Sequence, residues 1–577
     1  MSYRAPLHDL AFLMAHVADL PKIAATDRFA EATPDTAQAI LSEAARLCED
    51  VLAPLQRRGD TDPARLENGR VRCPEGFGEG YRAIAEGGWI GIAADPDHGG
   101  MGLPMTLATA VNEMMSSACL ALQLNPLMTQ GQIEALEHHA SDELKSWALP
   151  KLVSGEWSGT MNLTEPQAGS DVGALTTRAE PREDGTYAVT GQKIYITWGD
   201  NDFSGNVCHL VLARLPDAPA GTRGISLFLV PKILPGEPEM GGGTPGAANA
   251  VQVLSLEEKT GLHGSPTCVM DYAGATGWLV GEPHGGMAAM FTMMNNARLG
   301  VGVQGIGVAE AAFQQALAYA RDRKQGRASG TGTIVEHADV RRMLAGMRAE
   351  VQGARAIALM CAAAIDMKTA TGDPAWAARA AFLTPIAKAH GTEVGMSVAQ
   401  EGVQVHGGMG YIEETGAAQF VRDVRVTAIY EGTNGIQAMD LVGRKLADGG
   451  EAAFRLLDEI QQAAESARAG HPALAGPVWH AAEELREGTE WLLAQEDVTD
   501  RLAGAMAYLR AFARVLGAHA HLACAVAEAG EAGASGTRAA LAAVYVDRLL
   551  PQHAACLTEM RAGAAGLFAL SPDDLAA

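Results

Sequence analysis

The chain has 577 residues, of which 48% are hydrophobic and 19% charged, so it is too long for a single hydrophobic core and too apolar for a disordered chain. Its 44 Lys and Arg residues are outnumbered by 68 Asp and Glu, and the net charge of −24 argues against a nucleic-acid partner. A few local arginines and helix N-termini can still hold a small anionic ligand on such a protein.

The predicted elements form a short N-terminal extension, residues 1–35, and four successive units. Residues 36–157 show helical periodicity, as in TAQAILSEAARLCEDVLAPLQ. Residues 158–280 change to short apolar or alternating runs (TYAVTG, KIYITW, HLVLARL and GISLFLV) between Gly, Pro and Asp, which predicts an antiparallel β domain. Helical patterns return in residues 281–448, which suit an antiparallel bundle, and continue through a second helical unit, residues 449–577.

Cysteine spacing and the N-terminal sequence indicate the cellular compartment of the protein. The eight cysteines lie far apart without a CxxC pair, which is typical of reduced, mostly buried thiols. The opening MSYRAPLHDLAFLMAHVADL is interrupted by charged and histidine residues, so it lacks the apolar core of a signal peptide. No stretch is continuously apolar enough to span a bilayer. We therefore expect a cytoplasmic protein without membrane insertion.

Two motifs lie at and after the junction of the first helical unit with the β domain. MNLTEPQAGSD, from Met161 to Asp171, concentrates hydroxyls, backbone donors and a glycine, and taken alone it is typical of a capping and turn cluster. KIYITWGDND puts Tyr195, Thr197 and Trp198 on a strand that ends in a turn. Aromatics beside a hydroxyl can flank a planar cofactor, but an ordinary strand face is the simpler interpretation.

Two further motifs belong to the bundle. RDRKQGR, from Arg321 to Arg327, ends a long helix. It is either a solvated cationic C-terminus, which the helix dipole favours, or a clamp for a pyrophosphate. QVHGGMGY contains Gly407, Gly408 and Gly410, which let a ligand approach the backbone closely, although a lone glycine turn indicates little by itself.

The segment VTAIYEGTNGIQ carries one carboxylate, Glu431, between the apolar run from Ala428 to Tyr430 and a flexible glycine. Thr433 or Asn434 can then cap the next helix. A carboxylate held against apolar groups has its pKa raised towards the range of a general base at neutral pH. The alternative, a solvated loop glutamate, is the more common situation for such a residue in isolation.

One glycine pattern is a decoy. Gly300, Gly302 and Gly305 spell GxGxxG, but the dinucleotide fingerprint needs a preceding strand, whereas MFTMMNNARL has helical character. We expect these glycines to let a helix pack closely. The chain has no HExxH, paired Cys/His spacing, P-loop lysine motif or GxSxG elbow, so metal hydrolysis, phosphoryl transfer and serine hydrolysis lose their main support, and no metal site is predicted.

Together, in order and spacing, these motifs resemble the acyl-CoA dehydrogenase family across about residues 36–446. The resemblance implies a mainly α fold with a central β domain, in which a helical domain, an antiparallel β domain and a helical bundle enclose FAD. An extra C-terminal helical domain follows. The opening YRAPLHDLAFLM and the helical tail after Gly450 are similar to the large subgroup that includes 3-methylmercaptopropionyl-CoA dehydrogenases.

The resemblance also implies the contacts of the flavin end of FAD. Leu163 and Thr164 of NLTEP would contact the flavin ring, and Thr197 of YITW would lie near flavin N5. Tyr195 would pack on the ring, and Thr433 of YEGT would belong to the same cofactor-binding set.

A second set of contacts would lie at the pyrophosphate and adenosine end. Arg323 of RDRKQG is similar to the arginine that reaches the FAD pyrophosphate of a neighbouring subunit. Gln404, Gly407 and Gly408 would line the adenosine end of that shared site. The resemblance therefore implies a homodimer or a dimer of dimers.

For the substrate, the resemblance implies that Ser170 meets the CoA arm and that Arg298 and Gly432 help to position the thioester. Glu431 matches the family's usual catalytic base. It would remove the α-proton while flavin N5 accepts the β-hydride, which gives the trans-2-enoyl-CoA. Hydrogen bonds to the thioester carbonyl, from the Glu431 amide and a flavin ribose hydroxyl, would stabilise enolate character.

The subgroup resemblance implies 3-(methylthio)propanoyl-CoA as substrate, a step in dimethylsulfoniopropionate demethylation, with electrons passed to electron-transfer flavoprotein. Dehydrogenation of short, medium or long fatty acyl-CoAs is the alternative. An acyl-CoA oxidase, which passes electrons to oxygen, is another. A catalytically silent acyl-CoA-binding protein would show loss of the base, and Glu431 is present.

Overall fold

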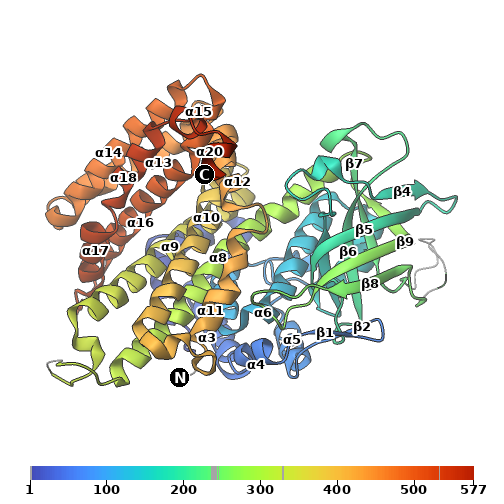
Figure 1. The fold of residues 1–577 in the computed structure, drawn as a ribbon, viewed down its shortest axis with the longest axis horizontal. Coiled ribbons are helices and arrows are strands. Elements are labelled where there is room, and N and C mark those ends of the chain that lie inside the picture. The colour runs from blue at the N-terminus through green and yellow to red at the C-terminus, as the bar shows by residue number, and fades with distance from the viewer. Residues whose placement is uncertain (1–2, 236–243, 245, 328–329, 532, 577) are drawn as a thin grey trace.

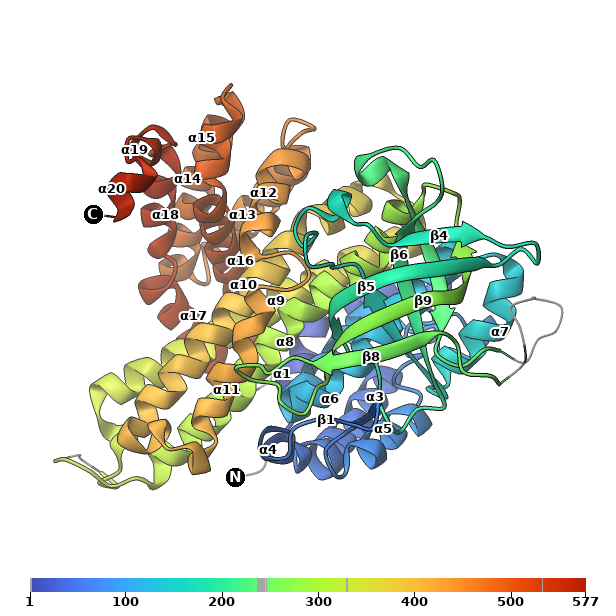
Figure 2. The same ribbon diagram turned by 45° about the vertical axis from the view of Figure 1, so that its right-hand side comes forward.

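The computed structural model describes residues 3–235, 244, 246–327, 330–531 and 533–576. Figures 1 and 2 show a lobe built around a β-sheet beside a larger lobe of helices, with the C-terminal helices at the far side of the helical lobe from the sheet. The mainly α fold with a central sheet domain and an additional C-terminal helical unit is thus confirmed.

The N-terminal helices pack around α6 (Met105–His139), which is buried along almost its whole length. It is the central helix of this unit, although several of its buried side chains are polar, among them Glu113 and Gln123. Cys119 interrupts it with non-helical angles, φ −157° and ψ 89°. The surrounding elements are α1 (Leu7–His16), α2 (Leu20–Ala24), α3 (Pro34–Arg46), α4 (Leu55–Thr61), α5 (Phe77–Glu86), α7 (Asp142–Val153) and the hairpin of β1 (Arg65–Glu67) and β2 (Arg70–Arg72).

Among the described residues, seven strands form the sheet, and five of them, β6, β4, β5, β9 and β7, pair in a closed ring. A closed ring leaves fewer unpaired strand edges exposed. β3 and β8 add to β6 and β9. The bounds are β3 (Trp157–Asn162), β4 (Arg178–Pro181), β5 (Tyr187–Thr197), β6 (Asn206–Arg214), β7 (Ile225–Pro231), β8 (Val251–Leu256) and β9 (Thr267–Val280).

Most of these pairings are antiparallel, as expected, but β6 also pairs in parallel with β3 and β4. Parallel partners need a long connection, which the chain between β3 and β6 provides. The runs TYAVTG and KIYITW, expected as separate strands, belong to β5 alone because Gly191 (φ 153°) continues the strand. Alternating hydrophobicity identifies strands, but it does not reveal how they pair.

In the bundle, α8 (Gly286–Asp322), α9 (Ala338–Thr371) and α10 (Pro374–His406) run side by side. The decoy glycines lie inside α8, which confirms that they serve helix packing. A Cβ on Gly302 would lie 2.5 Å from the Ala387 carbonyl oxygen, and one on Gly305 would lie 2.4 Å from that of Gly391. The bundle continues with η8 (Gly407–Tyr411), α11 (Ala417–Val424), η10 (Arg425–Ala428), α12 (Asn434–Asp440) and η11 (Leu441–Lys445).

The C-terminal unit packs on α9 and α10 through α16 (Ala505–Ala529). Arg514 of α16 donates to Glu350 of α9 at 2.6 Å. The extension also joins this unit, because the Arg538 guanidinium lies 3.6 Å from the ring centre of Phe12. The other helices are α13 (Glu451–Ala467), α14 (Pro472–Ala494), α15 (Val498–Ala503), α17 (Thr537–Arg548), α18 (Gln552–Arg561), α19 (Ala565–Phe568) and α20 (Pro572–Ala576).

All eight cysteines are free, and six of them are buried, as their spacing predicted. Within the described ranges, no helix combines the length and the apolar character needed to cross a membrane.

Candidate active site

Glu431 lies in the short loop between η10 and α12. Its φ of 57° is in the left-handed region, and Gly432 follows with φ 81°. A non-glycine residue in this region is uncommon and is often found at functional sites, where the surrounding structure holds the strain. The Thr433 hydroxyl accepts from the Ile436 amide at 3.2 Å, so Thr433 rather than Asn434 is the N-cap of α12.

The carboxylate of Glu431 is directed into the protein. Its Oε2 is buried and makes no hydrogen bond within the described residues. Burial raises the pKa of Glu431 to about 7, against the opposing effects of Arg298 and then Lys388. The direction expected from the apolar sequence context is therefore found, and the group is poised to exchange a proton near neutral pH.

Two basic side chains approach this loop from different helices. Arg298 of α8 is 5% exposed, lies 3.6 Å from an oxygen of Asp440, and has a buried Nε with no partner in the described chain. Lys388 of α10 is fully buried and donates to the Gly432 carbonyl at 2.9 Å and to Asn434 Oδ1 at 3.0 Å. Burial lowers the pKa of Lys388 to about 7.

The sequence motifs predicted Arg298 but not Lys388. A signal was available, because the lysine interrupts the otherwise apolar and small-residue run TPIAKAHG inside a long helix. Lysine is rarely fully buried without a specific partner.

On the sheet side, a buried ion pair fixes the NLTEP segment. Lys193 Nζ lies 2.8 Å from Glu165 and also donates to the Leu163 carbonyl at 3.0 Å. Burial opposes ionisation of both groups, but their attraction helps to lower the pKa of Glu165 to about 2. Thr164 follows β3 and is partly exposed, whereas Ser170 is fully on the surface.

The end of β5 departs from a regular strand. Its register with β9 shifts between Lys193 and Ile196, and Tyr195 has φ 60° with 61% of its surface exposed. Thr197 is partly buried. Trp198 turns inward, is completely buried, and donates from its indole to the Ala121 carbonyl at 3.2 Å.

The sheet side and the Glu431 loop meet at α6. The Trp198 bond reaches Ala121, just after the break at Cys119. Tyr430, directly before Glu431, donates its hydroxyl to Gln304 of α8, which in turn donates to Gln123 of α6 at 3.1 Å. Ala121 and Gln123 are two residues apart. One short stretch of α6 therefore connects the end of β5 with the loop that carries Glu431.

The other predicted cofactor residues lie elsewhere in the chain and are all exposed. Arg323, just beyond α8, is 25 residues from Arg298, which corresponds to about 37 Å along a helix. Gln404 is 16 residues beyond Lys388 on α10, or about 24 Å. Gly407 and Gly408 follow in η8. A single copy of the chain does not bring this group to Glu431.

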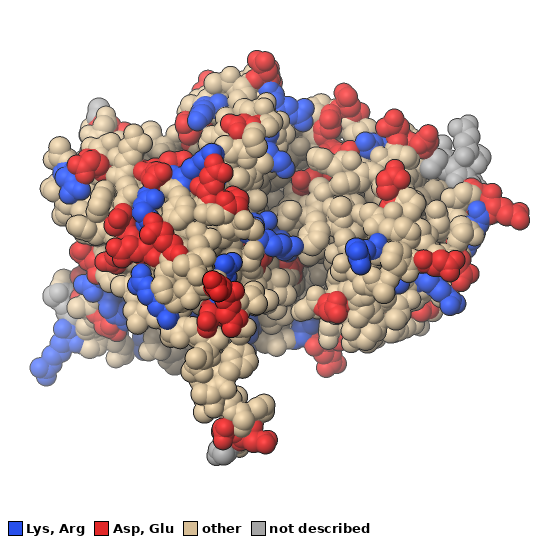
Figure 3. Space-filling model, turned by 90° about the horizontal axis from the view of Figure 1, so that it is seen from above, with Lys and Arg blue, Asp and Glu red and all other residues tan. Residues whose placement is uncertain are grey.

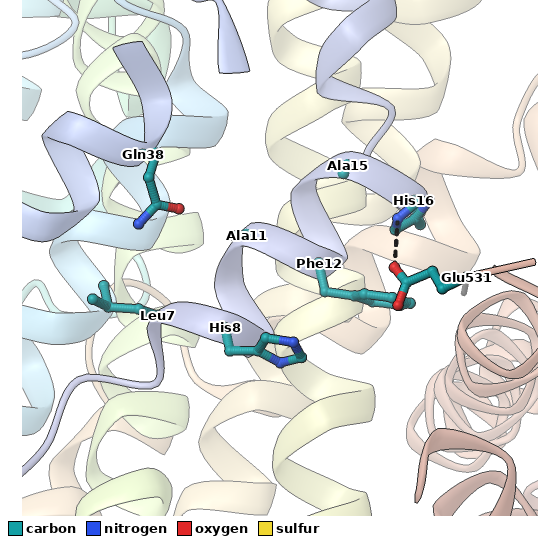
Figure 4. Close-up of a pocket in the computed structure, with 8 residues that line it drawn as sticks. All are labelled: Leu7, His8, Ala11, Phe12, Ala15, His16, Gln38 and Glu531. Atoms are coloured by element: carbon teal, nitrogen blue, oxygen red, sulfur yellow. Dashed lines mark ion pairs between the residues drawn. The ribbon is translucent and has the colours of Figure 1, made fainter. Parts of the chain in front are cut away.

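The cavity at α1 contains none of the predicted cofactor- or substrate-binding residues. It has a volume of about 470 Å³ and is lined by residues of α1 and by Gln38 and Glu531, and Figure 4 shows His16 in an ion pair with Glu531 at 3.8 Å. In the part of the chain that is described, no three His, Cys, Asp or Glu side chains are grouped to hold a metal ion. Acidic and basic side chains are interspersed on the face seen in Figure 3.

Comparison with known proteins identifies the domains. Three family models, the acyl-CoA dehydrogenase N-terminal, middle and C-terminal domains, match residues 34–156, 160–274 and 284–446. A fourth, acetyl-CoA dehydrogenase C-terminal like, matches residues 456–571. Together they cover most of the chain.

The chain is 49% identical to 3-methylmercaptopropionyl-CoA dehydrogenase of Ruegeria pomeroyi over 469 residues, which covers 80% of this chain and 79% of the relative. Its fold is similar to Caenorhabditis elegans ACDH-11 in complex with C11-CoA (TM-score 0.80, 20% identity, 94% and 91% covered). It is also similar to the Bacillus anthracis acyl-CoA dehydrogenase complexed with FAD (TM-score 0.74, 20% identity, 92% and 89% covered). The chain therefore belongs to the acyl-CoA dehydrogenase family of FAD-dependent oxidoreductases.

Proposed function

We propose that this acyl-CoA dehydrogenase converts 3-(methylthio)propanoyl-CoA to 3-(methylthio)acryloyl-CoA, with Glu431 as the base that removes the α-proton. The observation that carries the role of Glu431 is its buried, unpartnered Oε2, held on a left-handed residue beside Arg298 and Lys388. The substrate proposal is supported by the relative from Ruegeria pomeroyi, whose name states that reaction class.

The residues present fit FAD at this site. Buried polar atoms without partners are rare in proteins, and Glu431 Oε2 and the Arg298 Nε are two of them at the same loop. We assign the flavin end to Leu163, Thr164, Tyr195, Thr197 and Thr433; the exposed ring of Tyr195 offers a flat apolar surface. FAD, when bound, supplies the acceptor for the hydride that leaves the β-carbon.

The side chains around Glu431 account for removal of the substrate α-proton. Glu431 must be ionised to accept it, and Arg298 and Lys388 favour the ionised form. Once protonated, the carboxyl is neutral, which its buried position favours. Gly432 follows with φ 81°, a conformation that other residues rarely adopt, so the turn after the base favours glycine. Arg298 and Gly432 would position the thioester, and the exposed Ser170 would meet the CoA arm.

We propose that two copies of the chain complete each site, in a homodimer or a dimer of dimers. Arg323, Gln404, Gly407 and Gly408 would hold the pyrophosphate and adenosine end of the partner's FAD. Their distance from Glu431 along α8 and α10 supports this. So do Met409, Tyr411 and Ile412, which expose 46%, 86% and 43% of their surfaces next to the two glycines. Electrons would then pass to electron-transfer flavoprotein.

The base is tested with Glu431→Gln. We expect the variant to bind FAD and acyl-CoA as the wild type does but to lose turnover and exchange of the substrate α-proton with deuterated solvent. Glu490→Gln, at an exposed position on α14, is a matched control with unchanged turnover. Wild-type-like turnover in Glu431→Gln would show that the base lies elsewhere.

The substrate is tested by anaerobic titration of the FAD-loaded protein with a panel of acyl-CoAs, followed by bleaching of the flavin absorbance. We expect 3-(methylthio)propanoyl-CoA to bleach it at lower concentration than butanoyl-, octanoyl- or palmitoyl-CoA. If the protein preferred a longer acyl chain, the proposed substrate would be a fatty acyl-CoA instead. Peroxide formation in air without reduction of electron-transfer flavoprotein would indicate an oxidase, and no bleaching at all would indicate a silent binding protein.

A further inference from the structure

Lys388 is a fully buried basic side chain that the family resemblance does not assign to the site. Its side chain has no solvent exposure, yet no carboxylate lies within hydrogen-bond distance of its Nζ in the described structure. Both of its acceptors, the Gly432 carbonyl and the Asn434 side chain, are neutral and belong to the turn that follows Glu431. Placing an ammonium group there opposes its solvation, so the position needs a compensating interaction.

The helix packing explains how the lysine reaches this turn. Gly302 of α8 faces the α10 backbone, and a Cβ on it would lie 3.0 Å from the Lys388 Cα. The close approach places Lys388 and Arg298 on neighbouring helices around the same loop. Asn434 is itself held by Thr392, one turn further along α10, at 3.0 Å.

The turn after Glu431 is held from two directions. Lys388 binds the Gly432 carbonyl from α10, while Gln437 of α12 donates to the Glu431 and Gly432 carbonyls at 3.2 and 3.3 Å. A left-handed non-glycine residue persists only where its surroundings determine its conformation. Lys388 is the member of this set that also carries a charge.

The charged groups around Glu431 can be assigned by element. Arg298 of α8 and Lys388 of α10 favour its ionised form. Asp440 of α12 and Arg444 of η11 act on Arg298, and Tyr430 lies in the loop itself. On the α16 side of α10, Arg510 is paired with Glu393, and Arg514 with Glu350.

We infer that Lys388 is a positioning residue for the base: its buried amino group fixes the peptide that follows Glu431 and favours the ionised form of the Glu431 carboxylate before substrate binds. The inference rests on the proposed role of Glu431. Lys388 would then act on Glu431 through its charge as well as through its hydrogen bonds. Substitutions that remove the charge but keep a hydrogen-bond donor distinguish the two effects.

The test is the titration of Glu431 itself in the FAD-loaded protein without substrate. Infrared difference spectra across a pH series follow the protonated-carboxyl band, and the part that disappears in Glu431→Gln belongs to Glu431. In Lys388→Met the midpoint of that band should rise by about one pH unit, because a nearby cation is lost. Lys388→Gln, which can still donate to Gly432, should show the same rise, whereas Lys388→Arg should keep the wild-type midpoint.

Thr384→Val, one turn before Lys388 on α10, is the matched control, because within the described residues the Thr384 hydroxyl bonds only to its own helix and to Cys361. An unchanged midpoint in Lys388→Met or Lys388→Gln would overturn the inference, even if both variants were destabilised. Failure of the proposed function would appear separately, as turnover that survives in Glu431→Gln.

Discussion

Replacing Glu431 by glutamine should make the folded protein more stable at alkaline pH. Burial raises the pKa of this group from 4.5 to about 7, a shift of about 2.5 units, and each unit corresponds to about 1.4 kcal/mol. An ionised Glu431 therefore destabilises the folded state by about 3.5 kcal/mol relative to the unfolded chain. Glutamine has the same shape and no charge, so the variant avoids this cost.

The sign of the pH dependence follows from proton binding. Between pH 4.5 and 7 the folded protein holds a proton on Glu431 that the unfolded chain has lost, so stability falls as the pH rises through this interval. The destabilisation is absent below pH 4.5 and complete once the pH is above the pKa of Glu431 in the folded protein. The free-energy advantage of Glu431→Gln over the wild type should thus grow by about 2.5 kcal/mol between pH 5 and 8.

Urea unfolding at both pH values, with matched FAD content, measures this difference. Glu490→Gln changes an exposed glutamate of α14 and should give the same difference at both pH values. If Glu431→Gln behaved like that control, the carboxylate would not be held in a desolvated position, and the physical argument for its role as a base would fail.

Two other changes test the helix packing and the assembly. Gly302→Ala places a methyl group 2.5 Å from the Ala387 carbonyl oxygen and should lower the free energy of unfolding by about 1–3 kcal/mol in urea titrations. A methyl group added by Gly346→Ala on α9 meets nothing within 4 Å, so this control should be neutral or stabilising by up to about 1 kcal/mol. If both alanine variants changed the free energy of unfolding equally, the packing argument would be refuted. Tyr411→Glu, at an 86% exposed position, should reduce both the particle mass in light scattering and the bound FAD, and an unchanged mass would contradict the proposed subunit contact.

The sequence predicted the raised pKa of Glu431 from its apolar neighbours, and the direction is correct. The apolar neighbours alone do not explain the pKa of Glu431. Ile429, one of those neighbours, exposes 51% of its surface, and the charged groups around the carboxylate come from α8 and α10. Local sequence indicates that a residue is unusual, but the partners that tune its pKa are brought in by tertiary packing, which periodicity does not specify.

The same limit applies to the sheet and to the decoy glycines. Helical character before Gly300 was enough to reject a dinucleotide site, because the alternative required a strand at that point. The pairing of β6 with β3 and β4 in parallel left no trace in the alternation of their residues. The inward turn of Trp198 depends on a shift in strand register, which becomes visible only once β9 is in place.

The break in α6 has a consequence for how the site responds to substitutions in the N-terminal unit. Trp198 from the sheet and Gln304, which receives the Tyr430 hydroxyl, both rest on the stretch from Ala121 to Gln123. A substitution that shifts this stretch carries the end of β5 and the Glu431 loop in the same direction. The separation between the end of β5 and the Glu431 loop is thereby less sensitive to small shifts of the surrounding N-terminal helices.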